Sequence, residues 1–338
     1  PDPLPPAKET AELIQSAIAR AVARENLSRD LARATMEQVL AGEATPSQIA
    51  GLAVAMLIVP AQVYPWGSAV HAYIAGQLKP GNANVCYGTL APDMFNYAFE
   101  VGALKDVMYD LFHANPQLLW NAGGTSVERS LAYGFMNHKE DDQTAHYGGV
   151  QFGKNEGYVI AKAKVLDDIL ASKFPEYAAI RAAYPALSLS IAHNIVENSI
   201  DILIKRMDPQ VGLKLMQAAT LRDAGFPTMV LNVWGAVHPS LPVVIPAVES
   251  AFKTLMFNYG GLFYAYDEAG IIDGLSAQMA AFAPVFLPPG IELPYELAFQ
   301  IVKTGTIKGM DICKGTFFKE IKLTIEQART NLAGYDID

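Results

Sequence analysis

Apolar residues recur at the helical spacing of three to four along most of this chain, and this period constrains the fold more than any other feature. It is clearest over residues 68–77, 104–111, 127–147, 157–170 and 187–205. A half-buried strand would show strict alternation of polar and apolar residues, and no such run is long enough to indicate a sheet. Residues 207–338 continue as helices that are separated by Pro-rich loops. The sequence therefore predicts an all-α fold.

Composition and charge narrow the classes of function. The 338 residues are 51% hydrophobic and only 17% charged, which suits a large core and excludes a disordered chain. The 25 basic and 34 acidic residues give a net charge of −9. This balance is poor for a nucleic-acid coat protein, because phosphates are neutralised by Lys and Arg. It is no obstacle to a metal site, because bound cations invert the local field.

Three helices are expected before residue 60, at 9–24, 27–42 and 45–59, with Pro46 in the first turn of the third. The stretch 27–56 resembles the N-terminal helical domain of anthranilate phosphoribosyltransferases. The activity of that family needs a Gly-rich phosphoribosyl loop, and no such loop follows residue 60. The resemblance therefore implies a helical fold and no activity.

The longest apolar run, residues 49–63, is too short for a membrane span of about 20 residues, and Pro60 breaks it. It fits either the apolar region of a signal peptide or a buried helix, and we prefer the buried helix because almost 50 residues precede it. No transmembrane segment is predicted. The two cysteines, Cys86 and Cys313, either pair in an exported protein or lie apart as buried residues, which is the reading we favour.

One stripe of polar residues indicates metal chemistry. His138, Asp142 and His146 follow one another at intervals of four, so a continuous helix would place all three on one face. Imidazoles and carboxylates are ordinary zinc ligands, and the central carboxylate can bridge two ions. A second helix carries His193 and Glu197, again four residues apart and flanked by apolar residues.

Further candidate ligands precede these helices. Asp93 ends an expected loop at 88–93, His113 follows it, and His71 stands at the head of a helix that begins near Trp66. A lone buried histidine is more often a hydrogen-bonded core residue, and a single His/Asp pair is often a solvated helix face. Two helices that each carry such a pair favour a metal site instead. We expect His238 and Asp201 to have structural roles and not to bind a metal, although Asp201 can also orient a ligand histidine.

The order of these candidate ligands along residues 66–205 resembles that of the zinc-dependent phospholipase C and S1/P1 nuclease superfamily. That resemblance implies a helical core with up to three zinc ions. One ion would be held by Asp93, His113, His138 and Asp142. A second would share Asp142 and add His71 and the backbone of Trp66. A third would take His146, His193 and Glu197 and keep an open position for water.

One departure from that family concerns Trp66. In the family this amine is a free chain terminus, whereas an internal amide nitrogen has no usable lone pair. Either the second zinc site is incomplete, or residues 1–65 form a leader whose removal completes it. We state this processing as a hypothesis, and intact Pro1 on active protein would reject it.

The resemblance implies a zinc-dependent phosphoric diester hydrolase of the phospholipase C type, in which metal-activated water attacks phosphorus and Asp93 is the catalytic residue. The substrate would be a phospholipid or another phosphodiester, and the protein would be secreted or periplasmic. One alternative is an S1/P1-type single-strand nuclease, with nucleic acid as partner. Another is a non-catalytic helical assembly or interaction protein with a relict metal site. The sequence gives no oligomeric state.

Three regions follow from these interpretations. Residues 1–62 form a helical leader or small bundle, residues 63–240 a metal-binding helical core, and residues 241–338 a helical C-terminal extension. Three zinc ions would add six positive charges to the −9 of the chain.

Overall fold

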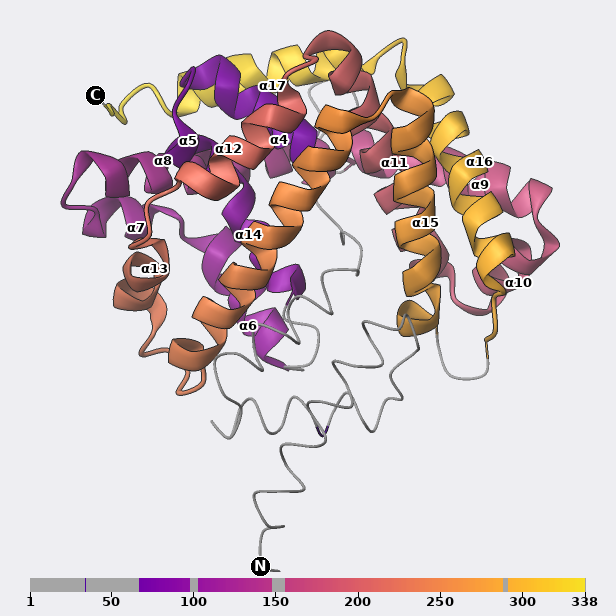
Figure 1. Cartoon of the computed structure of the whole chain (residues 1–338), viewed down its shortest axis with the longest axis horizontal. Coiled ribbons are helices and arrows are strands. Elements are labelled where there is room, and N and C mark those ends of the chain that lie inside the picture. Colours follow the sequence, from indigo (N-terminus) through magenta and orange to yellow (C-terminus); the bar gives the residue numbers. More distant parts are fainter. Residues whose placement is uncertain (1–33, 35–66, 98–102, 148–155, 288–290, 338) are drawn as a thin grey trace, which may run out of the picture.

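The computed structural model describes residues 67–97, 103–147, 156–287 and 291–337, together with Ala34, which is helical. Within these ranges, all regular secondary structure is helical and no strand occurs, which confirms the all-α prediction (Figure 1). Apart from Ala34, the three helices expected before residue 60 lie outside the described residues, as does Trp66.

The helices follow one another through the sequence with short connections. They are α4 (Ser68–Leu78), α5 (Ala83–Leu90), the 3₁₀ helix η1 (Ala91–Tyr97), α6 (Ala103–Ala114), α7 (Gln117–Ala122), α8 (Ser126–Asp142), the π-helical turn η2 (Gln143–Tyr147), α9 (Tyr158–Lys173), α10 (Pro175–Ala183), α11 (Pro185–Met207), α12 (Val211–Leu221), α13 (Phe226–Trp234), α14 (Leu241–Ala265), α15 (Glu268–Phe286), α16 (Tyr295–Cys313) and α17 (Phe317–Asn331).

Local sequence explains where α5 and α8 begin. Asn82 caps α5, because its side chain accepts the backbone N–H of Val85. Thr125 and Glu128 form a reciprocal capping box at the start of α8, where each side chain accepts a backbone N–H of the other. These caps satisfy N–H groups that the first helical turn leaves without a partner.

Two local expectations were wrong. The stretch 88–93 was expected to be a loop, but α5 continues to Leu90 and η1 follows at once. Pro92 fits there because the first helical turn needs no N–H from it. The stretch 127–147 was expected to be one continuous α-helix, but it changes to π-helical geometry at Gln143.

A close crossing of α5 and α8 sets the centre of the fold. Gly88 and Gly134 lie where the two backbones meet, and a Cβ at Gly134 would lie 2.5 Å from the amide nitrogen of Thr89. Around this crossing, Tyr87 meets Phe226 edge-on with ring centroids 5.2 Å apart, so that α5 is joined to α13. Such contact needs small residues on both helices, which explains the two glycines inside regular helices.

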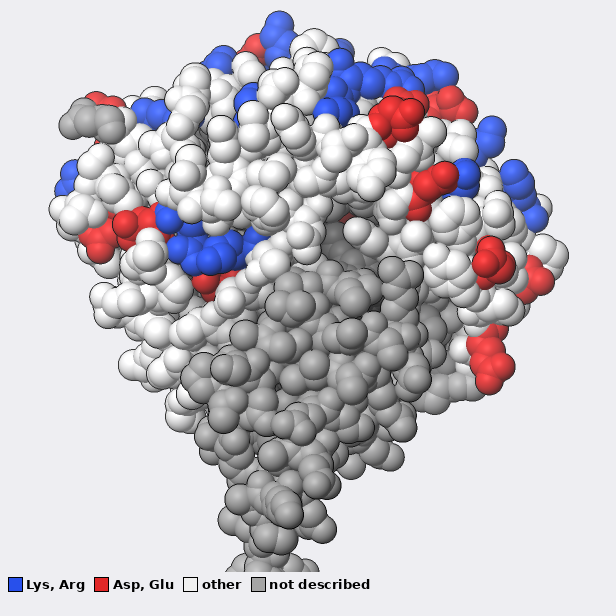
Figure 2. Space-filling model, viewed as in Figure 1, with Lys and Arg blue, Asp and Glu red and all other residues white. Residues whose placement is uncertain are grey.

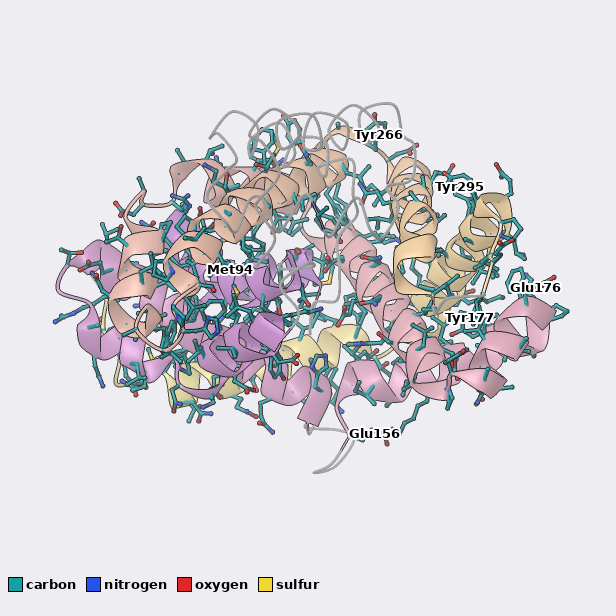
Figure 3. All side chains as sticks on the ribbon, turned by 90° about the horizontal axis from the view of Figure 1, so that it is seen from below. Met94, Glu156, Glu176, Tyr177, Tyr266 and Tyr295 are labelled. Carbon is teal, nitrogen blue, oxygen red and sulfur yellow. The ribbon has the colours of Figure 1, made fainter. Side chains whose placement is uncertain are left out.

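The apolar core is continuous from α4 to the residues after α17. In Figure 1, α14 crosses the middle of the molecule, α15 and α16 lie side by side, and α7 and α13 occupy the opposite end. The view from below places α10, which carries Glu176 and Tyr177, at the end far from α7 and α13 (Figure 3). The predicted boundary near residue 240 stays a prediction, although α12 before it packs closely on α14 after it.

The surface and the cysteines complete this description. Basic and acidic side chains are mixed in small groups on the face that Figure 2 shows, and much of its described surface is uncharged. In the described ranges, no helix combines the length and the hydropathy that a membrane span requires. Cys86 and Cys313 are both buried and unpaired, as predicted.

Candidate metal centre

The structure brings the predicted ligand residues that it describes together from six helical elements. His71 comes from α4, Asp93 from η1, His113 from α6, His138 and Asp142 from α8, His146 from η2, and His193 and Glu197 from α11. Their donor atoms form three groups in which all members lie within 4.8 Å of one another. The groups are His71, His138 and Asp142; Asp93, His113 and His138; and His146, His193 and Glu197.

The clearest geometry joins His113 and His138. The Nδ1 atom of His138 lies 2.8 Å from the carbonyl oxygen of Thr89, and the Nδ1 atom of His113 lies 2.9 Å from that of Tyr109. A carbonyl oxygen only accepts hydrogen bonds, so both Nδ1 atoms carry a proton. In the neutral rings both Nε2 atoms then present lone pairs, yet they are only 3.2 Å apart.

Two carboxylates complete this group. Asp93 Oδ1 lies 3.8 Å from His113 Nε2 and 3.9 Å from His138 Nε2. Asp142 Oδ2 lies 3.4 Å from His138 Nε2 and 3.8 Å from His113 Nε2. Each carboxylate therefore has an oxygen within 3.9 Å of both Nε2 atoms, at distances mostly somewhat longer than the roughly 3.3 Å between ligands of a tetrahedral zinc ion.

Burial makes this arrangement costly without a cation. Burial raises the pKa of Asp93 well above its ordinary value, and nearby Asp142 and Glu197 raise it further against the opposing effect of His138. For Asp142, burial also acts upward, but the imidazoles of His138, His146 and His113 outweigh it and hold its pKa at about 2. Burial lowers the pKa of His113, which favours the neutral ring that a metal needs.

His71 is oriented by Asp141, a residue that the sequence analysis missed. The Nδ1 atom of His71 lies 2.9 Å from Asp141 Oδ2, and both side chains are completely buried. Its Nε2 atom is buried without a hydrogen-bond partner, and its ring stacks on His138 with centroids 4.7 Å apart. A carboxylate behind an imidazole is the common support of a metal-bound histidine.

His146 lies in the group with His193 and Glu197, to which the resemblance assigned it, and not in line with His138 and Asp142 as helical spacing predicted. Its Nε2 atom lies 3.0 Å from His193 Nε2 and 3.7 Å from Glu197 Oε1. The pair His193 and Glu197, four residues apart on α11, is 2.7 Å apart between Nε2 and Oε1. The predicted stripe of three on one helix face is therefore wrong, because η2 turns His146 away from the register of α8.

Asp201 and His238 have structural roles here. Asp201 accepts the backbone N–H groups of Ala69 and Val70, each at 2.9 Å, and the hydroxyl of Tyr259 at 2.7 Å. Burial raises its pKa to about 7 against these donors. It thus anchors the first turn of α4, the helix that carries His71. His238 accepts the N–H of Ser240 in the turn before α14.

Solvent reaches the cluster at its edge. The side chains of His113, His146, His193 and Asp142 keep between 10% and 16% of their surface exposed, whereas Asp93 and His138 keep about 1%. The cluster is therefore less deeply buried on the side of His113 and His146 than at Asp93 and His138.

We predict that Asp141→Asn weakens zinc binding at His71 by about 10–100-fold, the typical effect of losing a support behind a ligand. The amide is a weaker acceptor and no longer makes the imidazole more basic. Competition with a chromophoric chelator measures the affinity. Glu140→Gln is the matched control, because it removes the neighbouring charge without contact to His71. Equal affinities for the two variants would contradict the prediction.

Comparison with known proteins gives one match. Residues 15–59 match the model of the glycosyl transferase family, helical bundle domain. No curated protein and no solved structure matches the chain. The match agrees with the resemblance of residues 27–56 to anthranilate phosphoribosyltransferases, and it lies outside the described residues apart from Ala34.

The same match overturns the expected activity. The family found is a glycosyl transferase family, and nothing found supports the phospholipase C and S1/P1 nuclease superfamily. The prediction of a zinc-dependent phosphoric diester hydrolase of the phospholipase C type was therefore wrong. The nuclease alternative finds no support, and the prediction of Asp93 as a catalytic residue stays untested. The physical basis of the hydrolase prediction was insufficient, because a pattern of donors spaced by four residues reflects metal geometry and recurs on unrelated folds. The substrate calls and the secreted or periplasmic location stay untested predictions.

Proposed function

We propose that this chain is a zinc-binding helical protein with up to three ions in one buried centre. The observation that carries the proposal is the pair of Nε2 lone pairs of His113 and His138, which face each other at 3.2 Å. Two neutral imidazoles repel in this arrangement, whereas a zinc ion between them would bind both. Zinc–nitrogen bonds of about 2.0–2.1 Å at a tetrahedral angle give a nitrogen separation of about 3.3 Å.

The first ion would be held by His113, His138, Asp93 and Asp142. Asp93 Oδ2 and Asp142 Oδ1 are further buried oxygens without a hydrogen-bond partner. Among the described residues, no Lys or Arg side chain forms an ion pair with either carboxylate. Buried carboxylates need a partner of opposite charge, and a metal ion supplies it.

The second ion would lie at His71. His138 can bind only one ion. Its Nδ1–H donates a hydrogen bond to the carbonyl oxygen of Thr89, so only the Nε2 lone pair remains. The group of His71, His138 and Asp142 therefore reduces to His71 Nε2 and the second oxygen of Asp142, which would bridge two ions. With two described donors, this ion is the weakest of the three.

The third ion would be held by His146, His193 and Glu197, with the three closest donor separations between 2.7 and 3.7 Å. Three protein donors leave a fourth tetrahedral position open to water. A zinc ion bound there lowers the pKa of that water toward 7. The chain's own part is to hold two imidazoles and one carboxylate in place on η2 and α11.

Substitution with Co²⁺ tests the proposal, because tetrahedral Co²⁺ absorbs strongly in the visible range and octahedral Co²⁺ does so weakly. We expect a strong visible band when Co²⁺ is added to the metal-free full chain, and its loss when Zn²⁺ is added. A spectrum equal to that of Co²⁺ in buffer would refute the proposal.

Glycosyl transfer is a second candidate, and it rests on the family match of residues 15–59 alone. Incubation of the full chain with a labelled phosphoribosyl donor and a set of acceptors tests it. Transfer of the label to an acceptor would support this function, and unchanged donor would reject it.

A further inference from the structure

We propose that Gly157 and Thr144 are positioning residues that hold η2 in π-helical geometry and thereby place His146 opposite His193. This inference rests on the proposed function, because it concerns the third zinc ion. It explains how one stretch of chain supplies ligands to two separate groups.

The π turn changes which face His146 occupies. In a regular α-helix, His146 would lie one turn beyond Asp142 and above it, in line with His138. A π turn contains one more residue than an α turn, which shifts the register by about 100° around the axis. His146 accordingly lies 3.0 Å from His193 on α11. Single π turns occur mostly as local insertions and are frequent at functional sites.

Gly157 lies directly against the backbone of this turn. Its amide N–H donates to the carbonyl oxygen of His146 at 3.0 Å. A Cβ at this position would overlap the carbonyl group of Ala145 and the amide nitrogen of His146. These are backbone atoms that cannot swing away, so a larger residue must displace the turn itself. The neighbouring residue Glu156 marks this place at the edge of the molecule in Figure 3.

Thr144 holds the turn from the opposite side. Its hydroxyl donates to the carbonyl oxygen of Asp141 at 2.9 Å, in the last turn of α8. The Oγ1 atom of Thr144 also lies 2.8 Å from Thr324 Oγ1 on α17, and both threonines are completely buried. The turn is therefore attached to α8 and α17 on one side, and to the segment that opens α9 on the other.

Gly157→Ala tests the inference in the full chain. We expect it to weaken the ion at His146, His193 and Glu197 by at least tenfold, in the range of about 10–100-fold that is typical for a lost support, and to leave the ion at His113 and His138 unchanged. Gly261→Ala is the control, because its Cβ meets nothing within 4 Å in α14. Zinc titration followed by the imidazole ¹⁵N resonances reports each histidine separately.

The double variant Gly157→Ala, His193→Ala adds a second readout. If both changes act on the same ion, the double variant loses no more zinc affinity than His193→Ala alone. Thr144→Val removes the hydroxyl at nearly constant volume, and we expect it to cause the same selective loss of zinc affinity. If Gly157→Ala does not fold, Thr144→Val tests the inference in its place. Wild-type affinity in the variants, or an equal loss at every histidine, would overturn the inference. Absence of any zinc-induced shift in the wild-type protein would overturn the proposed function with it.

Discussion

Replacement of His138 by alanine is expected to abolish binding of the first zinc ion and to weaken the second. His138 supplies the nitrogen nearest to His113, at 3.2 Å, and its ring stacks on His71. Its loss leaves Asp93 and Asp142 with one imidazole fewer to balance their charge. The loss of affinity should exceed the roughly 10–100-fold that is typical for an outer partner, because a direct ligand is removed.

His238→Ala is the matched control for this change. His238 is a histidine in a turn, where its ring accepts the N–H of Ser240, and it is far in sequence from every ligand. Equilibrium dialysis against buffered zinc should give wild-type stoichiometry for His238→Ala and at least one ion fewer for His138→Ala. Equal zinc content in the two variants would contradict the proposed ligand set.

Removal of the metal is expected to lower the melting temperature on the order of 10 °C. An ion that is present at a thousandfold excess over its Kd stabilises the folded state by about 4 kcal/mol. A change of this size shifts the transition of a domain of 150–250 residues by about 8–16 °C. Without the ion, the buried carboxylate of Asp93, whose pKa is raised by burial, no longer faces a cation. Scanning calorimetry before and after dialysis against a chelator measures the effect.

Two additions separate a zinc effect from a general effect of chelation. Zn²⁺ returned in slight excess should restore the original transition, while Mg²⁺ should not, because Mg²⁺ prefers oxygen ligands in an octahedral arrangement. A melting temperature that chelation leaves unchanged would argue against a metal that contributes to the folded state.

The sequence predicts the fold class and the types of donor well, because both follow from local patterns. Helical spacing predicts an all-α chain, and the pairs of donors four residues apart on α8 and α11 do lie within reach of each other. Residues 27–56 also indicate the helical family that the comparison found at 15–59. None of this depends on contacts between distant parts of the chain.

What the sequence did not predict depends on such contacts. The π turn at Gln143–Tyr147 ends the α-helical register in which residues four apart share a face. Gly157 and Thr324, which hold this turn, lie in other parts of the chain. Asp141 was missed because the neighbouring Asp142 already completed the spacing of four from His138. Asp141 is itself four residues from Asn137, and the Asn137 amide donates to its carboxylate at 3.1 Å. The expected activity failed because donor spacing describes a metal site and carries no information on the substrate.

The number of zinc ions per chain tests the central claim most directly. Native mass spectrometry of the full chain, checked by elemental analysis, gives this number at controlled free zinc. We predict two tightly bound ions, one at His113 and His138 and one at His146 and His193, and a third that binds only at higher zinc. Fewer than two zinc ions per chain at saturating zinc would contradict the account.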